Sequence, residues 1–344
     1  NLTHMGEFEM MKKTTSALAV AALLGTGAAT AATFQVNDDT TFGVAANIGY
    51  TYVSSESTSG TTENSLNNNS SDLRFSGESV SANGLTTTLY VELDGWGNDD
   101  GQTSGITQDQ MYVGLGGDFG TVELGTDIGT YGAVDGLKDI DWWSGVTGLS
   151  NDDDNMIRYT FPTMGNLSAS IGANVYDDGD DGTRSGTTLH GSISYDLGVV
   201  ALSAAYDNGG GLTGNNDEPF YGVGAQFDLA GVDTRVAYES DSDPDTEVDM
   251  LSITGIYSYG PGYVYGVAQS VSGDTSDDIS TLLTRENAAG TDVPDSGADD
   301  SVTQYNVGVA YNVTDNMTVY AEATRLGRSD DAGDQNSIGV NVSF

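Results

Sequence analysis

Sixteen segments of the chain place apolar side chains at every second residue, which is the period of a β-strand with one apolar and one polar face. In the stretch DLRFSGES, for example, the apolar Leu73 and Phe75 flank Arg74. This period predicts an all-β fold. The predicted strands cover residues 41–53, 72–80, 85–96, 107–115, 121–127, 156–162, 167–176, 187–195, 199–207, 220–228, 232–240, 248–259, 263–271, 302–312, 317–325 and 336–344.

The connections between these segments alternate strictly between short and long. Seven are tight turns, such as SANG at 81–84 and GPG at 260–262, and the other eight are longer and more acidic. A β-sandwich has no reason to sort its loops in this way. A transmembrane barrel does, because its short turns and long loops lie on opposite sides of the membrane. The sequence therefore predicts a 16-stranded antiparallel transmembrane β-barrel with short periplasmic turns and long acidic external loops.

The charged residues within the strands indicate which face is wet. An arginine facing lipid at the middle of the bilayer would cost about 2–4 kcal/mol, so we expect Arg74, Arg158 and Arg235 to point inward. Glu78 shares the face of Arg74 and should also line the interior. A barrel of so many strands encloses more space than side chains can fill, which predicts a water-filled bore. Lipid would cover the opposite face.

The first 31 residues are predicted to lie outside this fold. Residues 1–10 carry no pattern and are interpreted as a remnant of cloning. Residues 11–31 have the features of a secretory signal peptide: two lysines, an apolar stretch, and Ala29-Thr30-Ala31 before the cleavage site. Residues 32–344 would then form a single exported domain. The expected location is the bacterial outer membrane.

The composition excludes several classes of protein. A net charge of −41 argues against a nucleic-acid partner. The chain has no cysteine, so disulfides cannot stabilise it, and its 18 tyrosines argue against a disordered chain. The acid excess extends over nearly all the long loops, which suggests a surface adapted to concentrated salt. At about 1 M salt the screening length is only about 3 Å, so such a surface repels itself little.

Three local patterns resemble the Gram-negative general porins. They are TQDQMYVGLGGDFGTVELG at 107–125, NMIRYTFPTMGNLSAS at 155–170, and a C-terminal strand with Ile338, Val340, Val342 and Phe344. The last pattern is similar to the signal that the outer-membrane assembly machinery reads in this family. The resemblance spans residues 33–344. It implies a homotrimer of 16-stranded barrels, held in outer-membrane lipid, whose third external loop folds into the bore.

The resemblance also implies where the bore is narrow. The corresponding loop is 128–155, and its residues at the constriction would be Asp135, Lys138, Asp139 and Asp141. In the family, acids of this loop face a cluster of arginines on the wall. Arg74 and Arg158 lie in the matching second and sixth strands. The fourth strand, which in the family commonly carries a further arginine, has Asp109 here, and this change should weaken the basic side of the bore.

The sequence therefore predicts a passive diffusion channel for small hydrophilic solutes and ions. Its negative potential should favour cations by raising their local concentration. Three alternatives stay open: a non-conducting structural or adhesive barrel, a secreted acidic β protein, and an outer-membrane enzyme. The enzyme is disfavoured because a barrel lipase needs a Ser-His pair. The one histidine after the signal peptide, His190, is expected to be an ordinary residue of the bore lining.

No cofactor is predicted. The acidic stretch DDGDDG at 177–182 has carboxylates that could bind calcium, but its spacing matches no EF-hand. We expect a solvated loop there.

Overall fold

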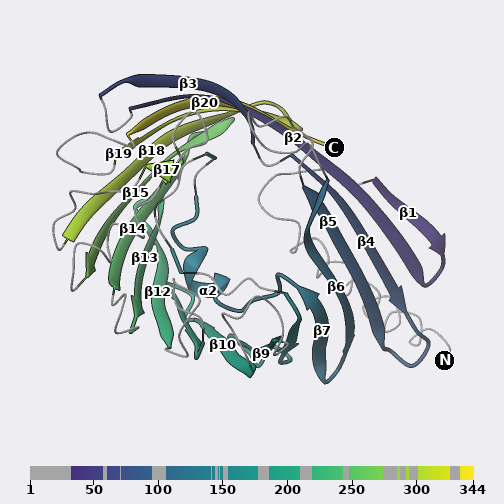
Figure 1. Cartoon of the computed structure of the whole chain (residues 1–344). Helices are drawn as coiled ribbons and strands as arrows, with labels where there is room; N and C mark the ends of the chain where they lie inside the picture. The colour runs from purple at the N-terminus through teal and green to yellow at the C-terminus, as the bar shows by residue number, and fades with distance from the viewer. Residues whose placement is uncertain are drawn as a thin grey trace.

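The structure is a computed structural model, and nearly all of it is one antiparallel sheet that curves round on itself (Figure 1). Among the described residues, no helix is long and apolar enough to cross a membrane. Residues 1–10, the expected signal peptide at 11–31 and the acidic stretch at 177–182 lie outside the described residues. The structure describes residues 32–56, 60–69, 71–94, 106–140, 142–143, 146, 148–149, 154–176, 186–209, 219–242, 248–273, 285–286, 292–293, 301–325 and 334–344.

The large sheet contains 18 strands, each paired with its neighbours in antiparallel register. A separate two-stranded pairing joins β16 (Arg285–Glu286) to β17 (Asp292–Val293). The strands of the large sheet are β1 (Ala32–Asn37), β2 (Thr40–Glu56), β3 (Thr62–Asn68), β4 (Asp72–Val80), β5 (Thr86–Asp94), β6 (Thr107–Gly117), β7 (Gly120–Thr126), β8 (Met156–Thr160), β9 (Leu167–Tyr176), β10 (Gly186–Asp196), β11 (Ala201–Asp207), β12 (Phe220–Leu229), β13 (Val232–Asp241), β14 (Val248–Ser258), β15 (Gly262–Gly273), β18 (Ser301–Thr314), β19 (Met317–Arg325) and β20 (Gln335–Ser343).

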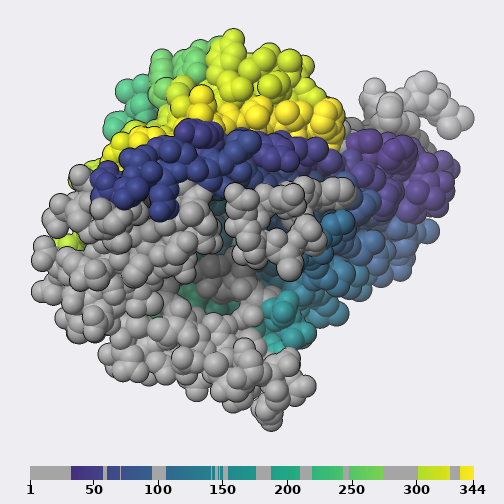
Figure 2. All heavy atoms as spheres, turned by 45° about the horizontal axis from the view of Figure 1, so that its top comes forward, coloured from purple at the N-terminus to yellow at the C-terminus, as the bar shows by residue number. Residues whose placement is uncertain are grey.

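The sheet closes where β2 pairs with β20. Beyond the end of β20, β1 pairs with the beginning of β2, so β1 and β20 share one position beside it. On its other side β2 pairs first with β4 and then with β3, which likewise share one position. The 18 strands therefore occupy sixteen positions, and the predicted 16-stranded barrel is confirmed. Figure 2 shows β2 and β3 lying directly beside the yellow C-terminal strands at this closure.

Each of the sixteen predicted segments matches a strand, and every end but one lies within two residues of its predicted position. Two strands were not predicted. β3 lies within the expected first long loop, and its sequence TENSLNN carries a single apolar residue, Leu66, so it has no readable period. β1 is only six residues long and directly follows the expected cleavage site.

The tight turn between β12 and β13 shows how neighbouring antiparallel strands are joined. In the turn between β12 and β13, Ala230 and Gly231 have φ values of 55° and 87°. Two positive φ angles in succession belong to a type I′ turn, whose twist matches that of a two-stranded ribbon. Glycine at the second position adopts this conformation without steric cost.

The two faces of the barrel have opposite character. The outer face exposes apolar side chains, such as Val113 and Leu124, which are 51% and 49% exposed. The inner face buries polar ones, including Gln269, Gln304 and Asn306. A soluble protein would show the reverse arrangement. Lipid around the barrel accounts for the outer face, and a hydrated interior accounts for the inner one.

These faces lead to a prediction about charge. Val113 lies at the middle of β6 on the outer face, so Val113→Arg should lower the free energy of unfolding by about 2–4 kcal/mol in lipid vesicles. The matched control is Glu78→Arg, which places the same side chain on the inner face of β4. It should change stability by much less. Denaturant titration of the vesicle-inserted protein measures both, and equal effects would contradict the assignment of the faces.

Candidate functional site

The chain between β7 and β8 folds into the barrel, and two residues set its direction. Asp127, just after β7, has φ 55°, and Asn155, just before β8, has φ 58°. Both lie in the left-handed region, which asparagine and aspartate tolerate better than most residues. The described part between them includes the short helix α2 (Gly132–Asp135), which contacts β10, β11 and β12 inside the barrel (Figure 1).

An apolar cluster attaches the first half of this loop to the wall. Tyr131 packs edge-on against Phe220 of β12, with ring centroids 4.8 Å apart, and Val134 lies in the same buried cluster. Leu137 packs beside it, over Gly224 of β12. A side chain at position 224 would collide with it, because a Cβ there would lie 2.1 Å from the Leu137 Cδ1.

A buried ion pair adds a second attachment. The Lys138 ammonium contacts the carboxylate of Asp135 and lies 2.7 Å from the Glu239 Oε2 of β13. Its side chain is only 3% exposed. The Leu149 backbone N–H donates to the other Glu239 oxygen. The structure thus places Lys138 between the loop and the wall rather than in the water of the bore, because Glu239 is buried and needs a counter-charge.

The tip of the loop reaches β19. One carboxylate oxygen of Glu322 accepts the Trp142 backbone N–H at 2.7 Å, and the other accepts that of Trp143 at 2.8 Å. The Trp142 ring stacks on Tyr320 with centroids 5.1 Å apart, and its indole N–H donates to the Tyr263 hydroxyl at 2.8 Å. We call Glu322, Tyr320 and Tyr263 the tip latch.

Neighbouring groups complete the tip latch. The Asn69 side-chain amide donates to the Trp142 carbonyl and to the Tyr320 hydroxyl, each at 2.6 Å. Glu322 also accepts from the hydroxyls of Tyr265 and Ser337. A buried carboxylate with this many donors is well compensated for lost water. The described part of the loop is therefore held along β10–β13 and again at β19.

The three predicted wall arginines lie on the inner face, and each has an acidic partner on the wall. Arg74 forms ion pairs with Asp72 and Glu92, both at 2.9 Å. Arg158 pairs with Glu123 at 2.7 Å.

Arg235 pairs with Asp233 at 2.8 Å. Arg235 and Arg158 also donate to the loop backbone, at the Gly136 and Gly129 carbonyls. The structure therefore brings two of the three arginines to the loop, whereas Arg74 forms its ion pairs with residues of the wall.

The two predicted wall acids follow the geometry of their strands. Glu78 lies on the inner face of β4, half-buried. In β6 the register against β5 shifts, so that Asp109 and Gln110 together oppose Glu92. This bulge places the exposed Asp109 near enough to Asp94 for the two carboxylates to repel each other. It also explains why simple alternation does not assign the face of Asp109.

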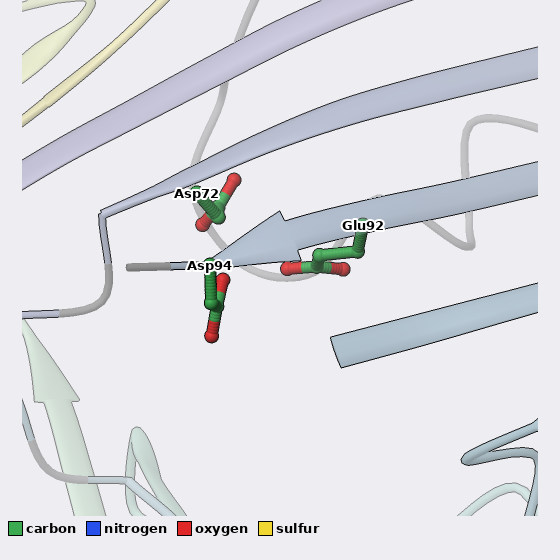
Figure 3. A group of neighbouring side chains, drawn as sticks. All are labelled: Asp72, Glu92 and Asp94. Atoms are coloured by element: carbon green, nitrogen blue, oxygen red, sulfur yellow. The ribbon is translucent and has the colours of Figure 1, made fainter. Parts of the chain in front are cut away.

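Acids outnumber bases on the wall strands β4–β8. Among the described residues of these strands there are two arginines and six carboxylates. Three of the carboxylates converge at the end of β5 (Figure 3). The six are Asp72, Glu78, Glu92, Asp94, Asp109 and Glu123.

The predicted loop acids take different positions. Asp135 is half-buried beside Lys138, and Asp139 is exposed. Although the Asp139 side chain keeps an exposed surface, the protein around it reduces its hydration and raises the pKa of its carboxyl, and the negative charge of Asp135 raises that pKa further. Lys138 offsets part of this rise. Asp141 lies outside the described residues.

His190 and the C-terminal strand complete the predicted residues. The His190 ring lies on the inner face of β10, where its Nδ1 is 2.9 Å from the Thr130 Oγ1 at the base of the loop. In β20, Ile338 is exposed on the outer face, and the exposed Phe344 follows the strand. Val340 and Val342 are half-buried between them.

Sequence reasoning missed the residues that hold the loop. Glu322 and Glu239 stand at inward positions of AEATR and AYESD, so their phase was available as a signal. Their contacts were not, because those depend on where the loop crosses the barrel.

Comparisons with known proteins agree with this geometry. A family model described as Gram-negative porin matches residues 15–331. A monosaccharide porin from Halomonas sp is 30% identical over 376 residues, which cover 97% of this chain and 100% of that relative.

Two solved structures share the fold. OmpF of Salmonella typhi, in complex with daunomycin, gives a TM-score of 0.69 at 15% identity, covering 91% of this chain and 100% of that one. An anion-selective porin from Comamonas acidovorans gives 0.66 at 16% identity, covering 89% and 100%.

The tip latch leads to a prediction about current. Glu322→Ala removes the acceptor of two backbone N–H groups, and hydrogen bonds to charged groups contribute about 1.5–3 kcal/mol each. The loop tip should detach, so single-channel recordings should show larger and noisier conductance. Glu78→Ala removes an inner-wall glutamate from β4 and should leave the current noise unchanged. A quiet Glu322→Ala channel would show that other contacts hold the tip.

Proposed function

Because the chain belongs to the Gram-negative porin family, we propose that its outer-membrane channel passes small hydrophilic solutes and ions passively and prefers cations. Members of this family are channels rather than enzymes. The observation that carries the preference is the charge of the wall. The strands β4–β8 bear six carboxylates and two arginines among their described residues. The infolded loop joins two of these strands, β7 and β8.

The pairing of the arginines supports the same preference. An arginine attracts anions in proportion to the charge that its neighbours leave uncompensated. Arg74 forms ion pairs with two carboxylates, and Arg158 forms an ion pair with Glu123. The field on this side of the bore is therefore negative. A porin with the same fold is anion-selective, so the side chains of the wall, and not the barrel, decide the sign.

The preference is tested by the reversal potential across a planar bilayer in a salt gradient, with a chelator present to remove divalent ions. At about 0.1 M salt the Debye length is about 10 Å, and the wild-type channel should favour cations more strongly than at 1 M. The double variant Glu92→Gln, Asp94→Asn should reduce the cation preference severalfold. Asp118→Asn, in a tight turn at the other rim, is the control and should behave as wild type.

Two outcomes would contradict the proposal. Anion preference at low salt would refute the selectivity. Absence of any conductance steps would favour the non-conducting structural or adhesive barrel instead.

The position of Asp139 predicts how selectivity depends on pH. Because the pKa of Asp139 is raised, this carboxyl becomes neutral at a higher pH than an ordinary aspartate as the solution is acidified. An ordinary aspartate titrates near pH 4. On acidification, the cation preference should therefore begin to fall at a pH above that value. In Asp139→Asn this early part of the decline should be smaller. If reversal potentials of the two proteins follow the same pH curve, Asp139 does not line the ion path.

The same channel is a candidate route for neutral sugars, because the Halomonas relative is a monosaccharide porin and aligns along its full length. Swelling of protein-loaded liposomes in glucose would test the passage of sugars through the channel. Absence of swelling would exclude glucose as a solute.

We further propose that residues 11–31 export the chain and that the outer-membrane assembly machinery reads Ile338, Val340, Val342 and Phe344. The assembled barrel would form a homotrimer. The acidic loops would suit concentrated salt. The family resemblance and the apolar outer face of β20 support assembly. Cross-linking in the membrane would test the homotrimer, and a monomer would contradict it. N-terminal sequencing would test the cleavage of the signal peptide, and a chain starting before residue 32 would contradict it.

A further inference from the structure

Three carboxylates meet on the inner wall at the end of β5. Asp72 and Asp94 are direct partners across the β4–β5 pair, and Glu92 precedes Asp94 by two residues on the same face. One oxygen from each of the three lies within 4.8 Å of the others (Figure 3). Like charges opposite each other on neighbouring strands are destabilising. This arrangement therefore requires compensation by positive charge.

Arg74 supplies only part of that charge. Its Nη2 lies 2.9 Å from the Asp72 Oδ2, and its Nε lies 2.9 Å from the Glu92 Oε1. One guanidinium against three ionised carboxylates leaves two negative charges. Both aspartates and Glu92 retain an oxygen that Arg74 does not contact.

A separate observation points to a missing partner. Asp72 is 4% exposed, and although Arg74 and the Asn47 side chain both interact with its carboxylate, its Oδ1 is buried without a hydrogen-bond partner among the described residues. A buried charged oxygen without a donor is costly. Figure 3 shows the Asp72 carboxylate beside that of Asp94. A cation between them would satisfy this oxygen, which Arg74 leaves unused.

The chemistry of the three side chains selects the ion. Carboxylate oxygens are hard ligands, suited to calcium and magnesium rather than to metals that prefer sulfur or imidazole. Calcium binds oxygens at about 2.3–2.6 Å, so two ligands of one ion lie up to about 5 Å apart, which accommodates the observed spread. A charge of two balances the two uncompensated carboxylates. Glu92 and Asp94 are only partly buried, so water from the bore can complete the coordination.

We propose that Asp72, Glu92 and Asp94 bind a calcium ion on the wall of the bore. The site goes beyond the proposed function, because binding at equilibrium does not depend on which ions permeate. When occupied, it would neutralise much of the negative charge beside Arg74. Calcium would then lower the preference for monovalent cations.

The test is calorimetric titration of calcium chloride into the folded full-length protein in detergent, after removal of divalent ions by a chelator. We expect one site per chain that binds calcium at least tenfold more tightly than the background of the acidic loops. Asp94→Asn should abolish this site. Asp233→Asn removes another inner-wall aspartate paired with an arginine and should retain it.

Equal isotherms for wild type and Asp94→Asn would overturn the proposal. Loss of the tight site in Asp233→Asn as well would also overturn it, because binding would then reflect diffuse charge. Circular dichroism checks that each variant folds, and Glu92→Gln replaces Asp94→Asn if the latter does not. The cation preference is measured in chelator, so a failure of the calcium site and a failure of the selectivity are distinguishable.

Discussion

The structure depends on closure of the sheet by backbone hydrogen bonds. In hydrocarbon no water can satisfy an open strand edge, so only a closed barrel leaves every strand paired. Closure falls on β2, which pairs with β20 along most of its length and with β1 at its beginning. Ala46 and Phe344 exchange backbone hydrogen bonds of 2.9 and 2.8 Å where these two partners meet. The outward side chains can then be apolar throughout, because lipid takes the place that a second layer would have in a soluble protein.

Closure also determines how the interior is organised. The infolded loop packs against a wall whose inward residues are mostly polar, so its attachments combine an apolar cluster with buried charge. Isolated buried charges are costly, and removing one partner of a buried pair is strongly destabilising. Lys138 with Glu239, and Glu322 with the loop backbone, are therefore attachments that fix position.

The electrostatics of the passage follow from pairing more than from composition. Arginines on a porin wall would suggest attraction of anions, but here Arg74 and Arg158 are held by carboxylates of adjacent strands. The bulge at Asp109 adds a further acid close to Asp94. The same carboxylates on which the proposed cation preference rests also produce the local excess of charge for which we infer a calcium ion.

The sequence by itself determined the strands, the inward and outward faces, and the sixteen positions of the barrel. A period of two residues shows directly which side chains face lipid. It did not reveal β3, in which Leu66 is the single apolar residue, nor the phase of Asp109, which a bulge displaces. Only the tertiary structure decided that Lys138 is buried against Glu239, that Trp142 reaches Glu322, and that three carboxylates converge beside Arg74. These contacts join residues far apart in the chain or on adjacent strands, and their geometry depends on the path of the loop and on the register of the closed sheet, neither of which is encoded in any local pattern.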